Sequence, residues 1–92
     1  MFYVNFVIIN LGGENLMEYE RIRNLREDND LKQKDLAAYL NCSQVSYSYY
    51  EIGKRDLPIS ALIRLAEYYN CSTDYLLGLT DEKKPYPRKT SQ

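Results

Sequence analysis

The segment "LKQKDLAAYLNCSQVSYSYYEIGKR", residues 31–55, contains the clearest structural pattern of this chain. Apolar residues recur with helical spacing in 33–40 and again in 44–52, which predicts two short helices. The residues between them predict a tight turn, because Asn41 tolerates a left-handed backbone conformation. Gly53 predicts the end of the second helix. Two helices joined by a three-residue turn have the proportions of a helix-turn-helix, although any hairpin of two helices shares this spacing.

The segments that flank this pair also predict helices. We expect a first helix over about 17–29, a fourth over about 59–69, directly after a proline, and a short fifth over about 73–79, capped by Ser72 or Thr73. The apolar residues expected to anchor these three helices are Tyr19, Ile22 and Leu25, then Ile59, Leu62, Leu65, Ala66 and Tyr69, then Tyr75, Leu76 and Leu79.

The two ends of the chain differ from this helical middle. Residues 2–11, "FYVNFVIINL", are β-branched and aromatic, which predicts a strand. A lone strand leaves its backbone groups unpaired, so three interpretations compete: it pairs with its copy in a dimer, it packs irregularly or is disordered, or it is not native and Met17 is the true start. We therefore expect an N-terminal extension over 1–16, one all-α domain over 17–80 and a polar, flexible tail over 81–92.

Composition narrows the functional classes. The chain has 92 residues, 45% of them hydrophobic and 27% charged, which suits one small soluble domain. No segment has the ~18 apolar residues that a membrane span needs, and we expect a cytoplasmic protein with no membrane contact. The net charge is −1, which argues mildly against a nucleic-acid binder. Local charge near the contact face matters more than the sum.

The reactive side chains do not predict an enzyme. There is no histidine, no nucleophile–base pair and no glycine-rich phosphate loop, so we expect no catalysis, no cofactor and no small-molecule substrate. Two cysteines, Cys42 and Cys71, do not form a zinc site or a disulfide framework, and we expect reduced, partly buried thiols. Glu51 is expected to pair locally, for example with an arginine of the first helix, rather than to act as an acid or base.

The second helix of the pair has an unusual outward face. Tyr47 and Tyr50 lie about 60° apart around the helix axis, so both can face the other helices. The opposite face carries no lysine, aspartate or glutamate, which is odd for a helix that only faces solvent. Hydrogen-bonding and small apolar groups of this kind suit the reading of base edges. The residues of this face are Val45, Ser48, Tyr49 and Ile52, and Gln44 and Ser46 flank it.

These side chains match the chemistry of the DNA major groove. The Gln44 amide can pair with adenine N6 and N7, and a Val45 methyl group can contact a thymine methyl group. A serine hydroxyl serves several bases, and Tyr49 can reach a base or a phosphate. The residues expected to contact bases are Gln44, Val45, Ser46, Ser48 and Tyr49.

Cations and a helix start surround this face. Gln33 begins the first helix of the pair, where backbone N–H groups and the helix dipole favour a phosphate. Lys54 and Arg55 follow the second helix and are expected to bind the DNA backbone by charge. Lys32 and Lys34 lie near the same edge.

Together these elements resemble the Cro and lambda-repressor-like, XRE-type, helix-turn-helix family over residues 21–81. The resemblance implies an all-α, five-helix DNA-binding domain that places the helix 44–52 in the major groove and binds an operator as a homodimer. The matching positions are Gln33, Leu36-Ala37, Ser43-Gln44, Tyr50-Glu51-x-Gly53-Lys54-Arg55-x-x-Pro58, Leu62-x-x-Leu65-Ala66 and Tyr75-Leu76-Leu77-Gly78.

The resemblance also assigns contacts by position. It implies that Gln44, Val45 and Tyr49 read bases. It implies that four residues hold phosphates: Gln33, Ser43, Lys54 and Arg55.

Three positions depart from the family pattern. Lys32 stands where a capping serine or threonine is common, and the missing cap is expected to cost about 1 kcal/mol. Asn41 replaces the usual glycine of the turn, and Tyr49 replaces a polar or basic residue. We expect a transcriptional repressor; the alternative is a protein-interaction module of the same fold, such as an antitoxin or an anti-regulator.

Overall fold

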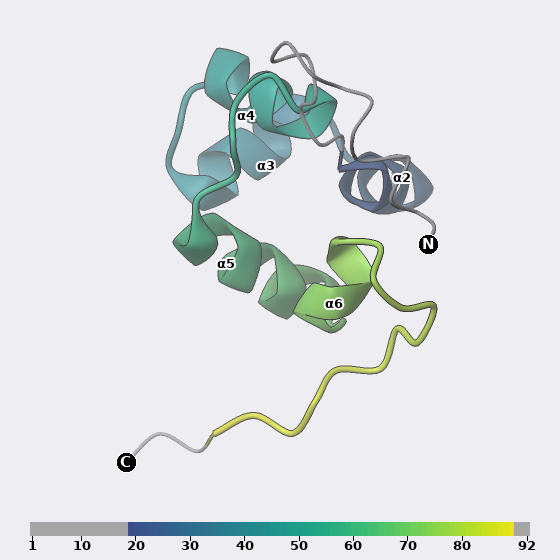
Figure 1. Cartoon of the computed structure of the whole chain (residues 1–92). Helices are drawn as coiled ribbons and strands as arrows, with labels where there is room; N and C mark the ends of the chain where they lie inside the picture. Colours follow the sequence, from purple (N-terminus) through teal and green to yellow (C-terminus); the bar gives the residue numbers. More distant parts are fainter. Residues whose placement is uncertain (1–18, 90–92) are drawn as a thin grey trace, which may run out of the picture.

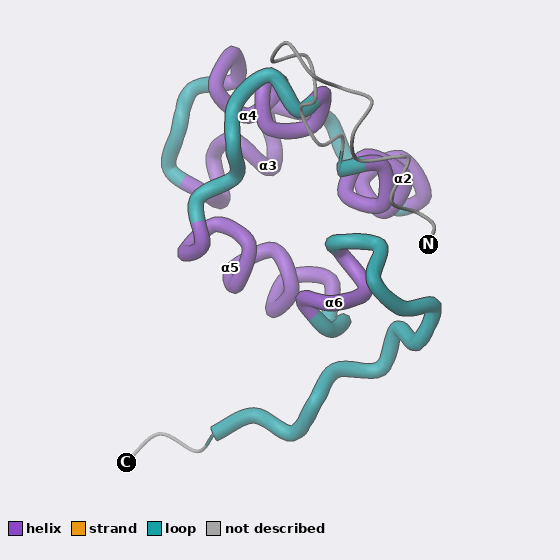
Figure 2. Tube along the Cα trace, in the orientation of Figure 1, coloured by secondary structure: helices purple, strands orange, loops and turns teal. Residues whose placement is uncertain are grey.

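A computed structural model of the chain describes residues 19–89, and every regular element in this range is a helix (Figures 1 and 2). This confirms the all-α, five-helix prediction. None of the helices in this range has the length and hydropathy to cross a membrane. The predicted strand, the candidate start at Met17 and the last three residues lie outside the described residues. The helices are α2 (Glu20–Asp28), α3 (Gln33–Leu40), α4 (Gln44–Ile52), α5 (Ile59–Tyr69) and α6 (Thr73–Leu76).

The helices surround one small core. Helix α3 packs mainly against α4, α4 also contacts α2, and α6 packs against both α5 and α2 (Figure 1). Because each helix buries one face in this core, α4 keeps its opposite face toward solvent. The buried residues of the core are Ile22, Leu25, Leu36, Ala37, Tyr47, Leu65, Ala66, Cys71 and Leu76.

One local sequence, Leu-Ala-x-Tyr-x-Asn-Cys-Ser, forms the same turn after α3 and after α5. Asn41 and Asn70 take left-handed conformations with φ of 59° and 53°. In both turns the cysteine N–H donates to the carbonyl five residues earlier at 3.0 Å. Ser43 Oγ and Ser72 Oγ then accept the N–H three residues later, at 3.0 and 2.9 Å, and cap the next helix. The predicted turn at Asn41 and cap at Ser72 are confirmed.

The start of α3 is better satisfied than the sequence suggests. Lys32 is the N-cap residue and its side chain makes no capping hydrogen bond, since an ammonium group accepts none. However, Asp35 Oδ2 accepts the Lys32 backbone N–H at 2.8 Å. This contact is the returning half of a capping box, so the expectation of an uncapped start is wrong in part.

Two predicted anchors and two predicted helix bounds are wrong. Ile59 is 75% exposed and Leu79 is 71% exposed. Helix α6 ends at Leu76, not at 79, because the chain turns at Gly78, where φ is +78°. Leu79 therefore lies beyond the helix whose face it was expected to extend. Helix α2 begins at Glu20, three residues later than expected.

The segment after α6 contacts the end of the helical domain that lies away from α4. The Ser72 N–H donates to the Lys83 carbonyl at 3.1 Å, and the Tyr86 hydroxyl donates to the Asp74 carboxylate at 2.8 Å. Figure 1 places this segment beyond α6. It leaves the outward face of α4 uncovered.

Candidate nucleic-acid interface

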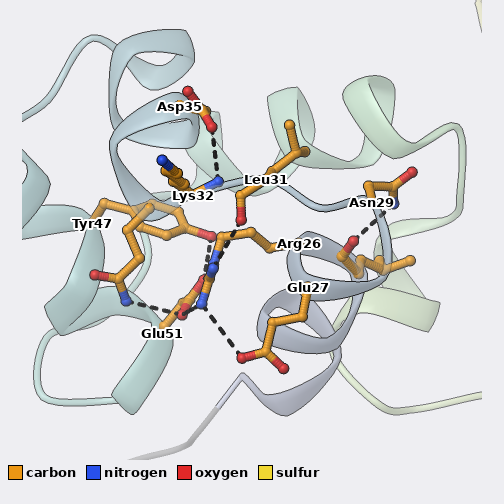
Figure 3. Close-up of polar contacts among 10 residues, drawn as sticks. Arg26, Glu27, Asn29, Leu31, Lys32, Asp35, Tyr47 and Glu51 are labelled. Carbon is orange, nitrogen blue, oxygen red and sulfur yellow. Dashed lines mark hydrogen bonds and ion pairs between the residues drawn. The ribbon is translucent and has the colours of Figure 1, made fainter.

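A buried ion pair orients α4 against α2. The Glu51 side chain is almost fully buried, and Arg26 donates to it from Nε at 2.6 Å and from Nη2 at 3.1 Å (Figure 3). The Tyr47 hydroxyl donates to Glu51 Oε2 at 2.7 Å. A charged group of this kind is tolerated in a core because its partners satisfy it. The prediction that Glu51 pairs with an arginine of the first helix is confirmed.

The Glu51 carboxylate is also hydrogen-bonded to the first residue of α3. Gln33 Nε2 donates to Glu51 Oε1 at 3.2 Å, and Arg26 Nη1 donates to the Leu31 carbonyl at 3.0 Å. The network thus joins α2, the loop before α3, the first residue of α3 and the last turn of α4. It fixes the position of the Gln33 side chain, which leaves its second amide hydrogen for a ligand.

The charges of this network depend on one another. Burial disfavours the charged form of Glu51, but hydrogen bonds from Arg26, Tyr47 and Gln33 outweigh burial and hold its pKa below the ordinary value. The hydrogen bond to Glu51 raises the pKa of Arg26. Burial, followed by the hydrogen bond to Glu51, raises the pKa of Tyr47, so the phenol stays protonated.

This pKa shift predicts how stability depends on pH. A carboxyl group whose folded pKa is lowered stabilises the fold above its unfolded pKa, and this contribution disappears as pH falls through the folded pKa. The free energy of unfolding should therefore decrease as pH falls below about 4.3, the ordinary value for glutamate. Urea unfolding at several pH values measures this free energy. Glu51→Gln should show a shallower decrease over this range, and equal slopes in both proteins would contradict the prediction.

The outward face of α4 begins with two exposed residues. Gln44 is exposed and Val45 is 59% exposed. Ile52 is exposed at the other end of the helix. The acidic residue of α4, Glu51, is buried on the opposite side, so this face presents no carboxylate. A surface of this kind does not repel phosphates.

The three serines of this region differ in their hydrogen bonds. Ser43 Oγ accepts the Ser46 N–H and donates to Ser46 Oγ at 3.1 Å. Ser48 Oγ donates to the Val45 carbonyl of its own helix at 2.8 Å. For Ser43 and Ser48, a DNA contact therefore requires the hydroxyl hydrogen to rotate away from its present acceptor.

The turn after α4 brings two cations onto Tyr49. Gly53 has φ of 76°, and the Lys54 N–H donates back to the Tyr49 carbonyl at 2.9 Å. Lys54 Nζ lies 5.4 Å, and Arg55 Cζ 5.1 Å, from the centre of the Tyr49 ring. Arg55 Nη1 donates a hydrogen bond to Ser46 Oγ at 3.2 Å. Sequence reasoning placed both cations after the helix but missed that Arg55 folds back over it.

The comparisons with known proteins agree with this geometry. A family model described as Helix-turn-helix matches residues 22–76, from α2 to α6. The chain is 38% identical over 69 residues to YobD of Bacillus subtilis (strain 168), named an uncharacterized HTH-type transcriptional regulator; the match covers 75% of this chain and 62% of YobD. It is 37% identical over 65 residues to the HTH-type transcriptional regulator ImmR of the same organism, covering 71% of this chain and 51% of ImmR.

A prophage-derived relative of the same organism, the uncharacterized HTH-type transcriptional regulator YonR, is 33% identical over 58 residues, which are 63% of this chain and 54% of YonR. The chain thus spans between about half and three fifths of the length of these relatives. No solved structure matches it. Because the family model covers more than half of the chain and all but the first two residues of its five helices, the chain belongs to the helix-turn-helix family.

Proposed function

We propose that this chain is a sequence-specific DNA-binding transcriptional regulator that inserts α4 into the major groove. The observation that carries the proposal is the outward face of α4, which presents hydrogen-bonding and apolar groups without a carboxylate and has cations at its end. The names of the similar proteins support regulation of transcription. Repression is the direction of regulation that we infer.

The division of contacts follows from exposure and hydrogen bonding. Gln44 and Val45 are open and lie in the first turn of α4, the part of a recognition helix that meets base edges. Ser48 lies one turn from Val45, and Tyr49 and the flanking Ser46 are joined by the Arg55 side chain; the three complete the proposed base-reading surface. We assign adenine recognition to Gln44, because its amide matches N6 and N7.

The proposed phosphate contacts lie at both ends of the pair. Gln33 is held by Glu51 at the first residue of α3, where the free N–H groups of a helix start favour an anion. Ser43 can contact a phosphate at the start of α4 once its hydroxyl hydrogen turns away from Ser46 Oγ, and Lys54 places an ammonium group after the end of α4. Arg55 brings a second positive charge to that end. Together they frame the base-reading surface.

One recognition helix gives a modest interface, so we infer that two copies bind two half-sites. Such half-sites lie about 34 Å apart on one face of the duplex. Selection of bound fragments from a random duplex pool tests both inferences, because it should return two related half-sites about 10 base pairs apart. A purified chain that binds no duplex at low salt ends the proposal in favour of a protein partner.

Lys54→Ala should weaken binding to all duplexes to the same degree. The ammonium group contacts the DNA backbone in this proposal, so its loss removes affinity without changing base preference. The slope of log affinity against log salt should become shallower by about 1. Fluorescence anisotropy at several salt concentrations measures both quantities.

The matched control is Lys84→Ala, which removes an exposed lysine from the segment beyond α6. It should leave affinity and salt slope unchanged. A Lys54→Ala loss confined to some sequences would contradict the phosphate assignment. An affinity of the unmodified chain that barely responds to salt would favour an uncharged protein contact instead.

A further inference from the structure

We propose that Arg55, which is grouped with the phosphate contacts above, instead reads a guanine, and that Ser46 and Tyr49 position it. This inference rests on the proposed DNA-binding function and deepens it by naming a base and the residue that recognises it. Its physical basis is the position of the Arg55 guanidinium group over the outward face of α4.

The backbone after α4 aims Arg55 at this face. Gly53 reverses the chain, and the N–H groups of Lys54 and Arg55 both donate to the Tyr49 carbonyl, at 2.9 and 3.3 Å. The start of the Arg55 side chain therefore lies beside the last turn of α4. From there the side chain runs along the helix toward its N-terminus, as far as Ser46.

Two contacts hold the guanidinium group in place. Its Cζ lies 5.1 Å from the centre of the Tyr49 ring, within the range of a cation–π contact, and its Nη1 lies 3.2 Å from Ser46 Oγ. Ser46 Oγ also accepts the Ser43 hydroxyl hydrogen at 3.1 Å, which restricts its rotation. Ser46 is the third residue of α4, so the guanidinium group lies among the side chains proposed to meet bases.

The remaining donors of Arg55 are available to a ligand. A guanidinium group has five N–H donors, and Ser46 takes one of them. In residues 19–89, the arginines that form ion pairs are Arg21 and Arg26, so Arg55 has no carboxylate partner there. Two parallel N–H groups match guanine O6 and N7, the commonest base-specific contact of arginine. Lys54 has no such planar fork and fits a phosphate as a point charge.

The test removes one acceptor atom from the base. The preferred duplex, found by selection, is made with 7-deazaguanine in place of each guanine in turn, which deletes the N7 acceptor. Binding of the full chain should fall by about 5-fold or more at one position in each half-site. Arg55→Ala should bind the normal and the modified duplex equally well, because the group that uses N7 is absent.

Two further variants separate base recognition by Arg55 from the general effect of positive charge and from the positioning of its side chain. Lys54→Ala also loses one cation near Tyr49 but should keep the full sensitivity to 7-deazaguanine. Ser46→Ala should lose most of that sensitivity while its salt slope stays unchanged, a readout that a structural role alone does not move. Arg55 is exposed, and melting followed by circular dichroism checks that each variant folds.

Three results would contradict either this inference or the proposed function on which it rests. Equal sensitivity of the unmodified chain and Arg55→Ala would overturn the inference and return Arg55 to the phosphates. A selected half-site that contains no guanine would overturn it as well, while leaving DNA binding intact. Failure of the unmodified chain to bind any duplex would instead refute the proposed function.

Discussion

Glu51→Ala is expected to lower the free energy of unfolding by about 3–5 kcal/mol, because it leaves a largely buried guanidinium group without its buried counter-ion. Arg26 makes two hydrogen bonds to this carboxylate, at 2.6 and 3.1 Å, and the other carboxylate near its guanidinium group is that of Glu27, which is exposed and lies 3.8 Å from Nη2. Tyr47 and Gln33 lose their acceptor at the same time. Because the free energy of unfolding of a small domain is itself small, a loss of this size should unfold most of the protein.

Thermal and urea unfolding, followed by circular dichroism, measure this effect. For a domain of this size the melting temperature should fall by roughly 4–8 °C for each kcal/mol lost. If Glu51→Ala does not fold, Glu51→Gln provides the measurement, because its amide retains an acceptor and part of the network. A loss below about 1 kcal/mol in either variant would contradict the role assigned to the ion pair.

A double-mutant cycle separates the interaction energy between Arg26 and Glu51 from the cost of burying each residue. Arg26→Met and Glu51→Leu should each destabilise the fold strongly, because each leaves one charged group without the opposite charge beside it. The double variant should lose much less than the sum of the two, because it leaves no charge behind in the core. Additive losses would show that the two residues act independently, against the distances between them.

The helix pair was predictable because its signals are local. Asn41 and Gly53 both take left-handed conformations, and Ser43 caps α4, as their residue types indicate. The bounds of α3 and α4 therefore agree with the prediction. The pairing of Glu51 with the first helix is not local, because Arg26 lies 25 residues earlier; it was predictable because an acid on the buried stripe needs a cation in reach.

The two wrong anchors lie at helix ends, where the helical periodicity of apolar residues no longer predicts burial. Ile59 is the first residue of α5, and no neighbouring turn covers it. Leu79 follows Gly78, whose left-handed conformation ends the period that was extended to it. The path of Arg55 was missed for a related reason: residue spacing on α4 says nothing about a side chain that returns from the following turn. The glycine at 53 was the available signal, because the turn it forms folds the chain back.

Gln44→Ala is expected to weaken binding to the preferred duplex by about 1–3 kcal/mol, which is about 5-fold to 150-fold. Gln44 is the first residue of α4 and is exposed, so its amide can approach a base without breaking the fold. An amide that spans adenine N6 and N7 makes two hydrogen bonds, and alanine makes none. Ser43 still caps the helix in the variant, so its stability should stay the same.

The measurement is an affinity for each duplex that carries one base-pair change in a half-site. The unmodified chain should discriminate at the position that Gln44 reads, and Gln44→Ala should bind all four base pairs there about equally while keeping its preferences elsewhere. Lys54→Ala is the matched comparison, because it should lower every affinity and keep every preference. A Gln44→Ala variant that behaves in that uniform way would place the amide on the backbone instead. The division between a base-reading first turn of α4 and a cationic end would then be wrong, although α4 would remain the helix that meets DNA.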